Sequence, residues 1–197
     1  MAAAAMNAAR FFAVFLVLAG CSSGSVPQPP LAGATIGGPF ALIDQHGRRV
    51  TDKDFAGRYR IMYFGYTSCP DVCPTDMQTL GAAMRLIDRR DPALSRRIVP
   101  VFVTVDPARD TPAVLGTFVS AFYPRMIGLT GSAQAIASVA KEYRVFYQAG
   151  PPGPTGDYVV QHSDQALLFG PDGKPIVIVP VQQTPQEVAE TLEEWVR

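Results

Sequence analysis

Two cysteines and one histidine are the residues of this chain best suited to chemistry. Cys69 and Cys73 are separated by Pro-Asp-Val, and His162 lies far along the chain. The thiolate is the form of cysteine that attacks disulfides and that ligates soft metal ions. Two thiols this close in a tight turn can therefore meet either in a disulfide or around one ion.

The number of available ligands limits which ion such a group could hold. Soft thiolates select Cu(I), zinc or iron–sulfur clusters. Structural zinc sites and clusters usually take four protein ligands, and beyond residue 38 the chain has only Cys69 and Cys73 as cysteines. A group of two cysteines and one histidine therefore suits copper better than structural zinc.

A structural disulfide is the simplest alternative for the cysteine pair. A bridge that closes so short a loop would remove little entropy from the unfolded chain. Reactivity or metal binding therefore explains the pair better than stability does.

The sequence around the cysteines predicts a buried strand before them and a helix after them. Residues 61–66 form a continuous apolar and aromatic run, which is typical of a strand buried on both faces. A helix is expected over residues 75–89, with a capping box formed by Thr75 and Gln78. Unpaired N–H groups at a helix start favour an anion, so we expect a lowered thiol pKa there.

The remaining patterns predict an α/β chain with the element order of a thioredoxin-like fold. In that fold a central mixed sheet is flanked by helices, and here an N-terminal β-hairpin precedes it. These elements are a hairpin over residues 40–50, a buried strand over 98–105, helices over 111–122 and 132–143, a hairpin over 165–179 and a helix over 184–196. Residues 148–157 form a Gly/Pro loop to which no structure is assigned.

This topology distinguishes the two histidines. His46 falls in a polar turn and is expected to be exposed. His162 is expected at the start of the strand that leads into residues 167–169. In a thioredoxin-like sheet the loop before that strand faces the redox-active cysteines, so we expect His162 to face Cys69 and Cys73. The Gly/Pro loop before it suggests a hinge that lets the ring swing toward the cysteines when metal arrives.

The N-terminal residues resemble a bacterial lipoprotein signal. Arg10 precedes an apolar run over residues 11–18, which is shorter than the roughly 20 residues that span a bilayer. Leu18-Ala19-Gly20 then leads to Cys21, the expected site of lipidation. An ordinary cleaved signal with an incidental cysteine is the alternative. The predicted organisation is a signal peptide over residues 1–20, a tether over 21–38 and one domain over 39–197.

The expected location of the domain and the net charge of the chain limit which classes of function are plausible. A secretory signal places the domain outside the cytoplasm, where thiols oxidise unless something keeps them reduced. The 17 basic residues are balanced by 17 acidic ones, so no basic surface is expected for nucleic acid.

Three separated motifs, in the same order, resemble the Sco/SenC/PrrC family of copper chaperones. They are YFGYTSCPDVCP over residues 63–74, VDPARDTP over residues 105–112, and His162 followed by FGPDGK over residues 169–174. The resemblance extends from about residue 40 to the C-terminus. It implies a thioredoxin fold that binds Cu(I) or Cu(II) through Cys69, Cys73 and His162.

The resemblance also implies a role and partners. Family members help to assemble the binuclear copper centre of cytochrome c oxidase, by metal transfer, thiol reduction or both, at the outer face of the inner membrane. The implied partners are the copper-bearing subunit of the oxidase and a periplasmic copper donor or thiol reductase. Many members carry an acidic residue before the histidine, where this chain has Gln161, so tuning of the histidine is expected to differ.

Three other functions remain as alternatives to a metallochaperone. A thiol–disulfide oxidoreductase would usually have a spacer one residue shorter and would have no use for His162 as a ligand. A peroxiredoxin-like peroxidase would place a threonine a few residues before its reactive cysteine in a proline-containing loop, and Thr67 lies near Cys69 without that proline. A passive copper-binding or redox-sensing module would have no client oxidase.

Other residues near the motifs have simpler expected roles. Asp71 is first a turn former after Pro70, although its carboxylate could also tune the thiols. Asp106 and Asp110 are expected to cap the following helix and close their loop, with Arg109 pairing to them. The aromatic residues of the first buried strand, Tyr63, Phe64 and Tyr66, are expected in the core.

Overall fold

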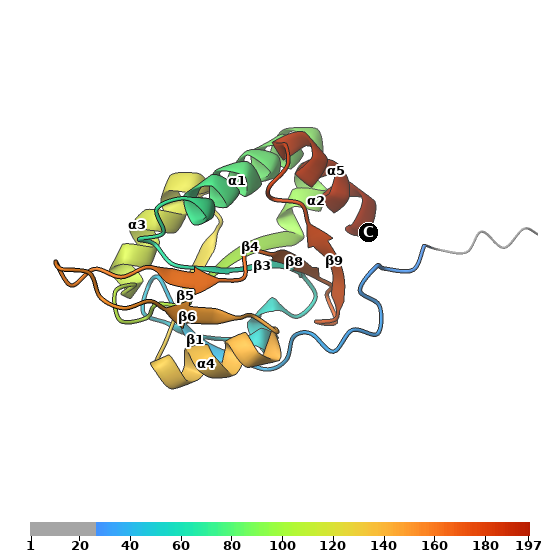
Figure 1. Ribbon diagram of the computed structural model, residues 1–197. Helices are drawn as coiled ribbons and strands as arrows, with labels where there is room; N and C mark the ends of the chain where they lie inside the picture. Colours follow the sequence, from blue (N-terminus) through green and yellow to red (C-terminus); the bar gives the residue numbers. More distant parts are fainter. Residues whose placement is uncertain (1–26) are drawn as a thin grey trace, which may run out of the picture.

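A seven-stranded mixed sheet forms the centre of the computed structural model, which describes residues 27–197 (Figure 1). In the order in which they lie side by side, its strands are β2 (Arg49–Thr51), β1 (Ala41–Asp44), β5 (Ile127–Thr130), β4 (Ile98–Thr104), β3 (Tyr59–Gly65), β8 (Ala166–Phe169) and β9 (Pro175–Val179). The predicted signal peptide, Cys21 and the first part of the tether lie outside the described residues.

The two central strands confirm the predicted buried runs. Every residue of β3 and of β4 is buried, as expected for parallel strands covered on both faces. They pair in register from Tyr59 opposite Ile98 to Gly65 opposite Thr104, so the ends of both strands meet at one edge of the sheet. The cysteine loop leaves from that edge.

Helices cover both faces of the sheet, as predicted. Two right-handed crossovers, β3 to β4 and β4 to β5, place α1 (Val72–Arg90) and α3 (Pro112–Phe122) on the same face. The terminal helix α5 (Pro185–Trp195) packs beside α1, and α4 (Ala133–Glu142) covers the opposite face (Figure 1). The short helix α2 (Pro92–Arg96) and the 3-10 turn η1 (Asp52–Phe55) complete the described helices.

The start of α1 differs from the prediction. The helix begins at Val72, three residues earlier than expected, with Asp71 as its N-cap residue. Pro74 is compatible with this because a helix needs no N–H donor in its first turn. The Thr75 hydroxyl donates to the Asp71 carbonyl 3.0 Å away, so the predicted capping box of Thr75 and Gln78 is wrong. Cys73 therefore belongs to the helix rather than to the loop.

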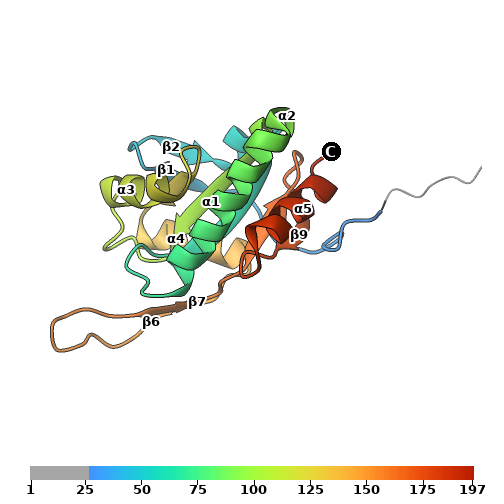
Figure 2. The ribbon, with the colours of Figure 1, turned by 90° about the horizontal axis from the view of Figure 1, so that it is seen from above.

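A second, two-stranded sheet flanks the Gly/Pro loop over residues 148–157, to which the sequence assigned no structure. Strands β6 (Tyr147–Ala149) and β7 (Val160–His162) pair antiparallel, with Tyr147 opposite His162. This hairpin projects from the body of the molecule (Figure 2). His162 therefore ends a strand of its own, and its predicted place at the start of the strand leading into residues 167–169 is wrong.

Within residues 27–197, none of the helices has both the length and the apolar character needed to cross a bilayer.

Candidate metal centre

The cysteine loop joins the end of β3 to the start of α1. The Cys69 amide donates to the Tyr66 carbonyl at 3.2 Å, which turns the chain back toward the sheet. The Cys73 amide, in the first turn of α1, points at the Cys69 Sγ at 3.5 Å. The fold thus brings the two sulfurs together at the amino end of the helix, and both cysteines are free.

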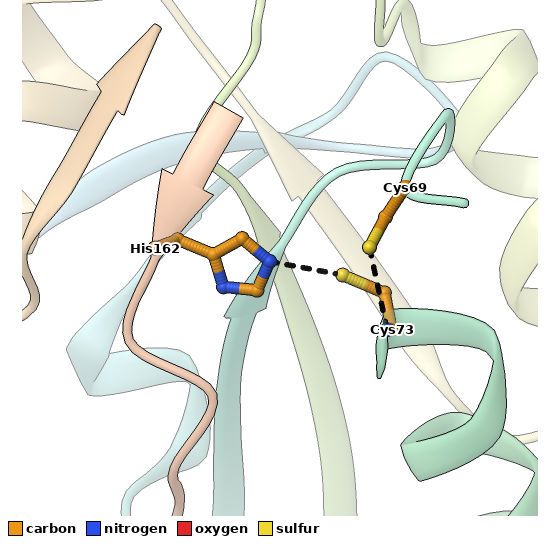
Figure 3. A group of neighbouring side chains, drawn as sticks. All are labelled: Cys69, Cys73 and His162. Atoms are coloured by element: carbon orange, nitrogen blue, oxygen red, sulfur yellow. Dashed lines mark hydrogen bonds between the residues drawn. The ribbon is translucent and has the colours of Figure 1, made fainter. Parts of the chain in front are cut away.

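The histidine reaches the cysteines from the β6–β7 hairpin. His162 Nε2 lies 3.2 Å from Cys73 Sγ, and its Nδ1 lies 3.0 Å from the Ser163 carbonyl oxygen (Figure 3). Since a carbonyl oxygen can only accept, Nδ1 carries the ring proton and Nε2 turns its lone pair toward the sulfurs. A backbone acceptor on the distal nitrogen is the usual way in which proteins orient a metal-ligating histidine.

The three side chains together form a potential metal site. One ligand atom from each of Cys69, Cys73 and His162 lies within 4.8 Å of the other two. Cys73 is fully buried, whereas Cys69 and His162 are half-buried. His46, by contrast, is exposed in its turn, as predicted. The site is therefore closed on the Cys73 side and accessible from the side of Cys69 and His162.

The predicted effect of the helix start on thiol acidity is wrong for Cys73. Burial raises the pKa of the Cys73 thiol, and the neighbouring Cys69 sulfur raises it further. The loss of water around a buried thiolate thus outweighs the favourable helix dipole. A bound cation reverses this balance, because a coordinating thiol loses its proton. The Cys73 thiol therefore keeps its proton until a cation arrives.

Aromatic rings enclose the inner wall of the site. Tyr63 and Tyr66 are buried, as predicted for core residues, and both present ring edges to His162, at centroid distances of 6.4 and 5.8 Å. The Tyr63 hydroxyl donates to Asp76 at 2.8 Å, and burial raises the pKa of both groups. Gly65 completes the wall, because a Cβ there would lie 2.7 Å from Cys73 Sγ. Only glycine leaves room for the sulfur in this position.

A buried carboxylate fixes the cysteine loop to the sheet. Asp110 is fully buried and accepts hydrogen bonds from the Thr67 amide at 3.0 Å, the Thr67 hydroxyl at 2.6 Å and the Thr104 hydroxyl at 2.6 Å. The predicted role of Asp110 as a helix cap is wrong, because the Thr111 side chain caps α3 instead. In the sequence, the only indication of the contact between Asp110 and the two threonines was that polar residues follow the buried runs of β3 and β4.

A second set of contacts fixes the hairpin that carries His162. Arg109 pairs with Asp106, as predicted, and donates to the Tyr158 carbonyl at 3.0 Å. The Tyr158 hydroxyl donates to Asp106 at 2.8 Å, and the Arg109 guanidinium stacks on the Tyr158 ring at 3.9 Å. The same guanidinium faces Tyr66 at 5.4 Å. The loop after β4 therefore holds both halves of the site.

We expect replacement of Tyr158 by phenylalanine to loosen the hairpin. The change removes the bond to Asp106, and a hydrogen bond to a charged group is worth about 1.5–3 kcal/mol. Amide hydrogen exchange at Gly150 and Ser163, whose N–H groups donate to the Val159 and Phe146 carbonyls across the hairpin, should then accelerate by roughly 10-fold or more. Tyr147→Phe, on the same hairpin, is the matched control. Unchanged exchange at Ser163 in Tyr158→Phe would show that the Asp106 contact does not hold the hairpin.

Comparison with known proteins agrees with this geometry. The family model described as SCO1/SenC matches residues 28–197. The chain belongs to the SCO1/SenC family.

Individual relatives share both sequence and fold. The chain is 45% identical over 136 residues to the mitochondrial protein SCO2 homolog of Bos taurus, covering 69% of this chain and 50% of the relative. It spans about half the length of the curated relatives it matches. It superposes on the structure of Bradyrhizobium japonicum ScoI with copper bound with a TM-score of 0.74 and 38% identity, over 81% of this chain and 99% of the other.

The thioredoxin-like character of the fold is confirmed by a more distant structure. The thioredoxin domain of a thiol–disulfide oxidoreductase from Bacteroides vulgatus matches with a TM-score of 0.58 at 15% identity, over 82% of this chain and 96% of the other. This likeness concerns the fold alone.

Two polar residues of this SCO1/SenC protein lie next to the ligand-bearing segments without contacting the cysteines. Asp71 is exposed, and among the described contacts its carboxylate makes no hydrogen bond to either cysteine. Gln161, the residue before His162, is exposed on β7. A tuning role for Asp71 stays a prediction.

Proposed function

We propose that this chain carries copper, as Cu(I) or Cu(II), in a site formed by Cys69, Cys73 and His162. The observation that carries the proposal is the mutual approach of the three ligand atoms within 4.8 Å. Two sulfurs and an imidazole are the soft donors that copper prefers. The copper held by the Bradyrhizobium relative supports the same cargo here.

The unequal burial of the three proposed ligands favours transfer of copper to a partner over its storage. Cys73 is fully buried, whereas Cys69 and His162 are partly open to solvent. An incoming ligand from a partner can therefore approach the metal on the open side, while Cys73 retains it. The cargo would leave when the partner's ligands replace first those of Cys69 and His162 and then that of Cys73, without a large movement of the sheet.

The same cysteines support a second candidate function, thiol reduction. Both thiols are free and close together. The more accessible Cys69 would attack a disulfide of the client, and Cys73 would then displace the mixed disulfide. The client disulfide gains two electrons and two protons and becomes two thiols, while Cys69 and Cys73 lose them and form a disulfide.

We propose the copper-bearing subunit of cytochrome c oxidase as the client. A periplasmic copper donor or thiol reductase would reload the site. A lipid on Cys21 would hold the domain at the outer face of the cytoplasmic membrane, which the signal-like residues 1–21 support. Loss of the gene should lower the amount of assembled oxidase, and added copper should restore it. Unchanged oxidase assembly would exclude this client.

Copper loading of the purified, reduced chain tests the site itself. We expect one copper per chain and a thiolate-to-copper charge-transfer band. Removal of an outer hydrogen-bond partner usually lowers metal affinity about 10–100-fold, so loss of the ligand in His162→Ala should lower it at least that much. His46→Ala, in the exposed turn, is the matched control. Full copper retention with an unchanged band in His162→Ala would leave thiol reduction as the better account.

A further inference from the structure

A buried arginine lies at the end of the molecule opposite the metal site. Arg60 stands at the start of β3, whose other end leads into the cysteine loop, and it is only 4% exposed. Its Nη2 donates to the Tyr143 hydroxyl at 3.2 Å, and its guanidinium lies over the Phe169 ring at 5.2 Å. No part of the proposed copper chemistry involves this side chain.

The charge of Arg60 is not compensated within the described part of the chain. No carboxylate among residues 27–197 lies within 4.0 Å of its guanidinium, and its buried Nε has no hydrogen-bond partner there. Arginine is almost never fully buried without a paired group, because removing its charge from water is costly. An uncompensated cation in this position indicates that a negatively charged partner is missing.

A hollow next to Arg60 provides room for that partner. It has a volume of about 320 Å³ and is lined by Arg60, Lys53 and the backbone of Gly38 and Gly173, among others. A Cβ on Gly173 would lie 3.5 Å from Arg60 Nη2, so the absence of a side chain there keeps the guanidinium open to the hollow.

The charges around this hollow favour an anion. Gly38 and Gly173 also line an adjoining hollow of about 480 Å³, which adds three cations, Lys141, Arg144 and Lys174. The acids facing the two hollows are Asp52, Asp172 and Glu142. Asp52 already accepts the Phe40 amide, and Asp172 already pairs with Lys174 at 3.2 Å. Five cations therefore face three acids, and once the pair of Lys174 and Asp172 is set aside, four cations face two acids.

We propose that Arg60 binds a phosphate group in this hollow. The guanidinium fork matches the oxygens of a phosphate, and a phosphate dianion would satisfy both Arg60 and a neighbouring lysine. A mainly apolar groove of about 620 Å³, lined by Pro29, Pro171 and Ile176 among others, lies on the same end of the molecule. The segment that enters the domain from the tether forms part of its wall (blue in Figure 1). The phosphate is either a free ion or the headgroup of a lipid.

Thermal unfolding of the purified full chain tests the free ion. Inorganic phosphate is compared with chloride at equal ionic strength. At tenfold the dissociation constant, phosphate should raise the Tm by about 3–6 °C. The rise should be absent in Arg60→Leu and preserved in Arg89→Leu, which removes an exposed arginine of α1.

Lipid nanodiscs distinguish the headgroup from the free ion. The full chain is placed in phosphatidylcholine nanodiscs with and without phosphatidylglycerol, and hydrogen exchange is followed over residues 52–60 and 170–174. If the headgroup is the ligand, phosphatidylglycerol slows exchange there by about tenfold at tenfold the dissociation constant, and Arg60→Leu abolishes the effect.

Two results would overturn the proposal. One is the absence of any response to phosphate and to phosphatidylglycerol, and the other is an equal response in Arg60→Leu. If Arg60→Leu does not fold, Arg60→Lys, which keeps the charge but loses the fork, takes its place. Amide chemical shifts of Gly38 and Gly173 in the unaltered protein, titrated with phosphate, then decide whether the hollow is occupied.

Discussion

Replacement of Cys73 by serine should abolish copper retention while leaving the fold intact. Cys73 lies at the centre of the proposed copper site, because its Sγ lies 3.2 Å from His162 Nε2 and its amide points at the Cys69 sulfur. A serine hydroxyl is a hard, neutral donor that does not replace a thiolate for copper. Cys69 and His162 alone cannot enclose the ion, since both are partly open to solvent. We therefore expect copper to be lost on desalting against a chelator.

The fold of Cys73→Ser can be monitored independently. The substitution is nearly isosteric and buries one hydroxyl, which costs about 1–3 kcal/mol when unpaired. A modest fall in Tm should thus accompany complete loss of metal. Ser68→Ala, at an exposed position of the same loop, should keep one copper per chain. Stoichiometric copper in Cys73→Ser would show that the three-ligand site is not the binding site.

Hydrophobic patterns were sufficient for the main elements of the fold. The uninterrupted apolar runs became β3 and β4, which are buried on both faces. The sequence signals for three helix starts also matched the structure, because Thr111, Ser132 and Thr184 each cap a helix through their side chains, whereas the signal for the start of α1 did not. Local residues decide both features, so no knowledge of the rest of the chain was needed.

Contacts between distant segments were much harder to predict. The strands β6 and β7 are only three residues each and lie in a Gly/Pro-rich region, so no periodicity marks them. Their position depends on Arg109 and Asp106, which hold Tyr158 from another loop. The direction of His162 followed from fold topology, but the strand that carries it did not. The raised pKa of Cys73 likewise depends on burial that only the packed structure determines.

Different residues of one loop, that between β4 and α3, hold the cysteine loop and the histidine hairpin in place. Asp110 holds the cysteine loop through Thr67, whereas Asp106 and Arg109 hold the histidine hairpin through Tyr158. The cysteines and the histidine come from segments that lie far apart in the sequence. Their approach therefore requires a shared support, and the loop between β4 and α3 supplies it.

Replacement of Asp110 by alanine should be the most destabilising of the changes considered. It would leave three donors, the Thr67 amide and the hydroxyls of Thr67 and Thr104, without their acceptor. Each unsatisfied buried donor costs about 1–3 kcal/mol, so the free energy of unfolding should fall by roughly 3–5 kcal/mol. For a chain of this size, that corresponds to a fall in Tm of about 10 °C. Chemical denaturation measures the loss directly.

The predicted loss of stability depends on the buried position of the Asp110 carboxylate, which an exposed carboxylate does not share. Asp71→Ala removes a carboxylate from the cysteine loop that Asp110 holds, but that side chain is exposed and caps nothing through a hydrogen bond, so stability should change by less than about 0.5 kcal/mol. Asp110→Asn keeps one acceptor oxygen, so its free energy of unfolding should lie between those of Asp110→Ala and Asp71→Ala. Equal stability of Asp110→Ala and Asp71→Ala would mean that the buried bonds of Asp110 add nothing. If they anchor the loop as the geometry indicates, Asp110→Asn should also weaken copper binding, because the loop that positions Cys69 loses its attachment to the sheet.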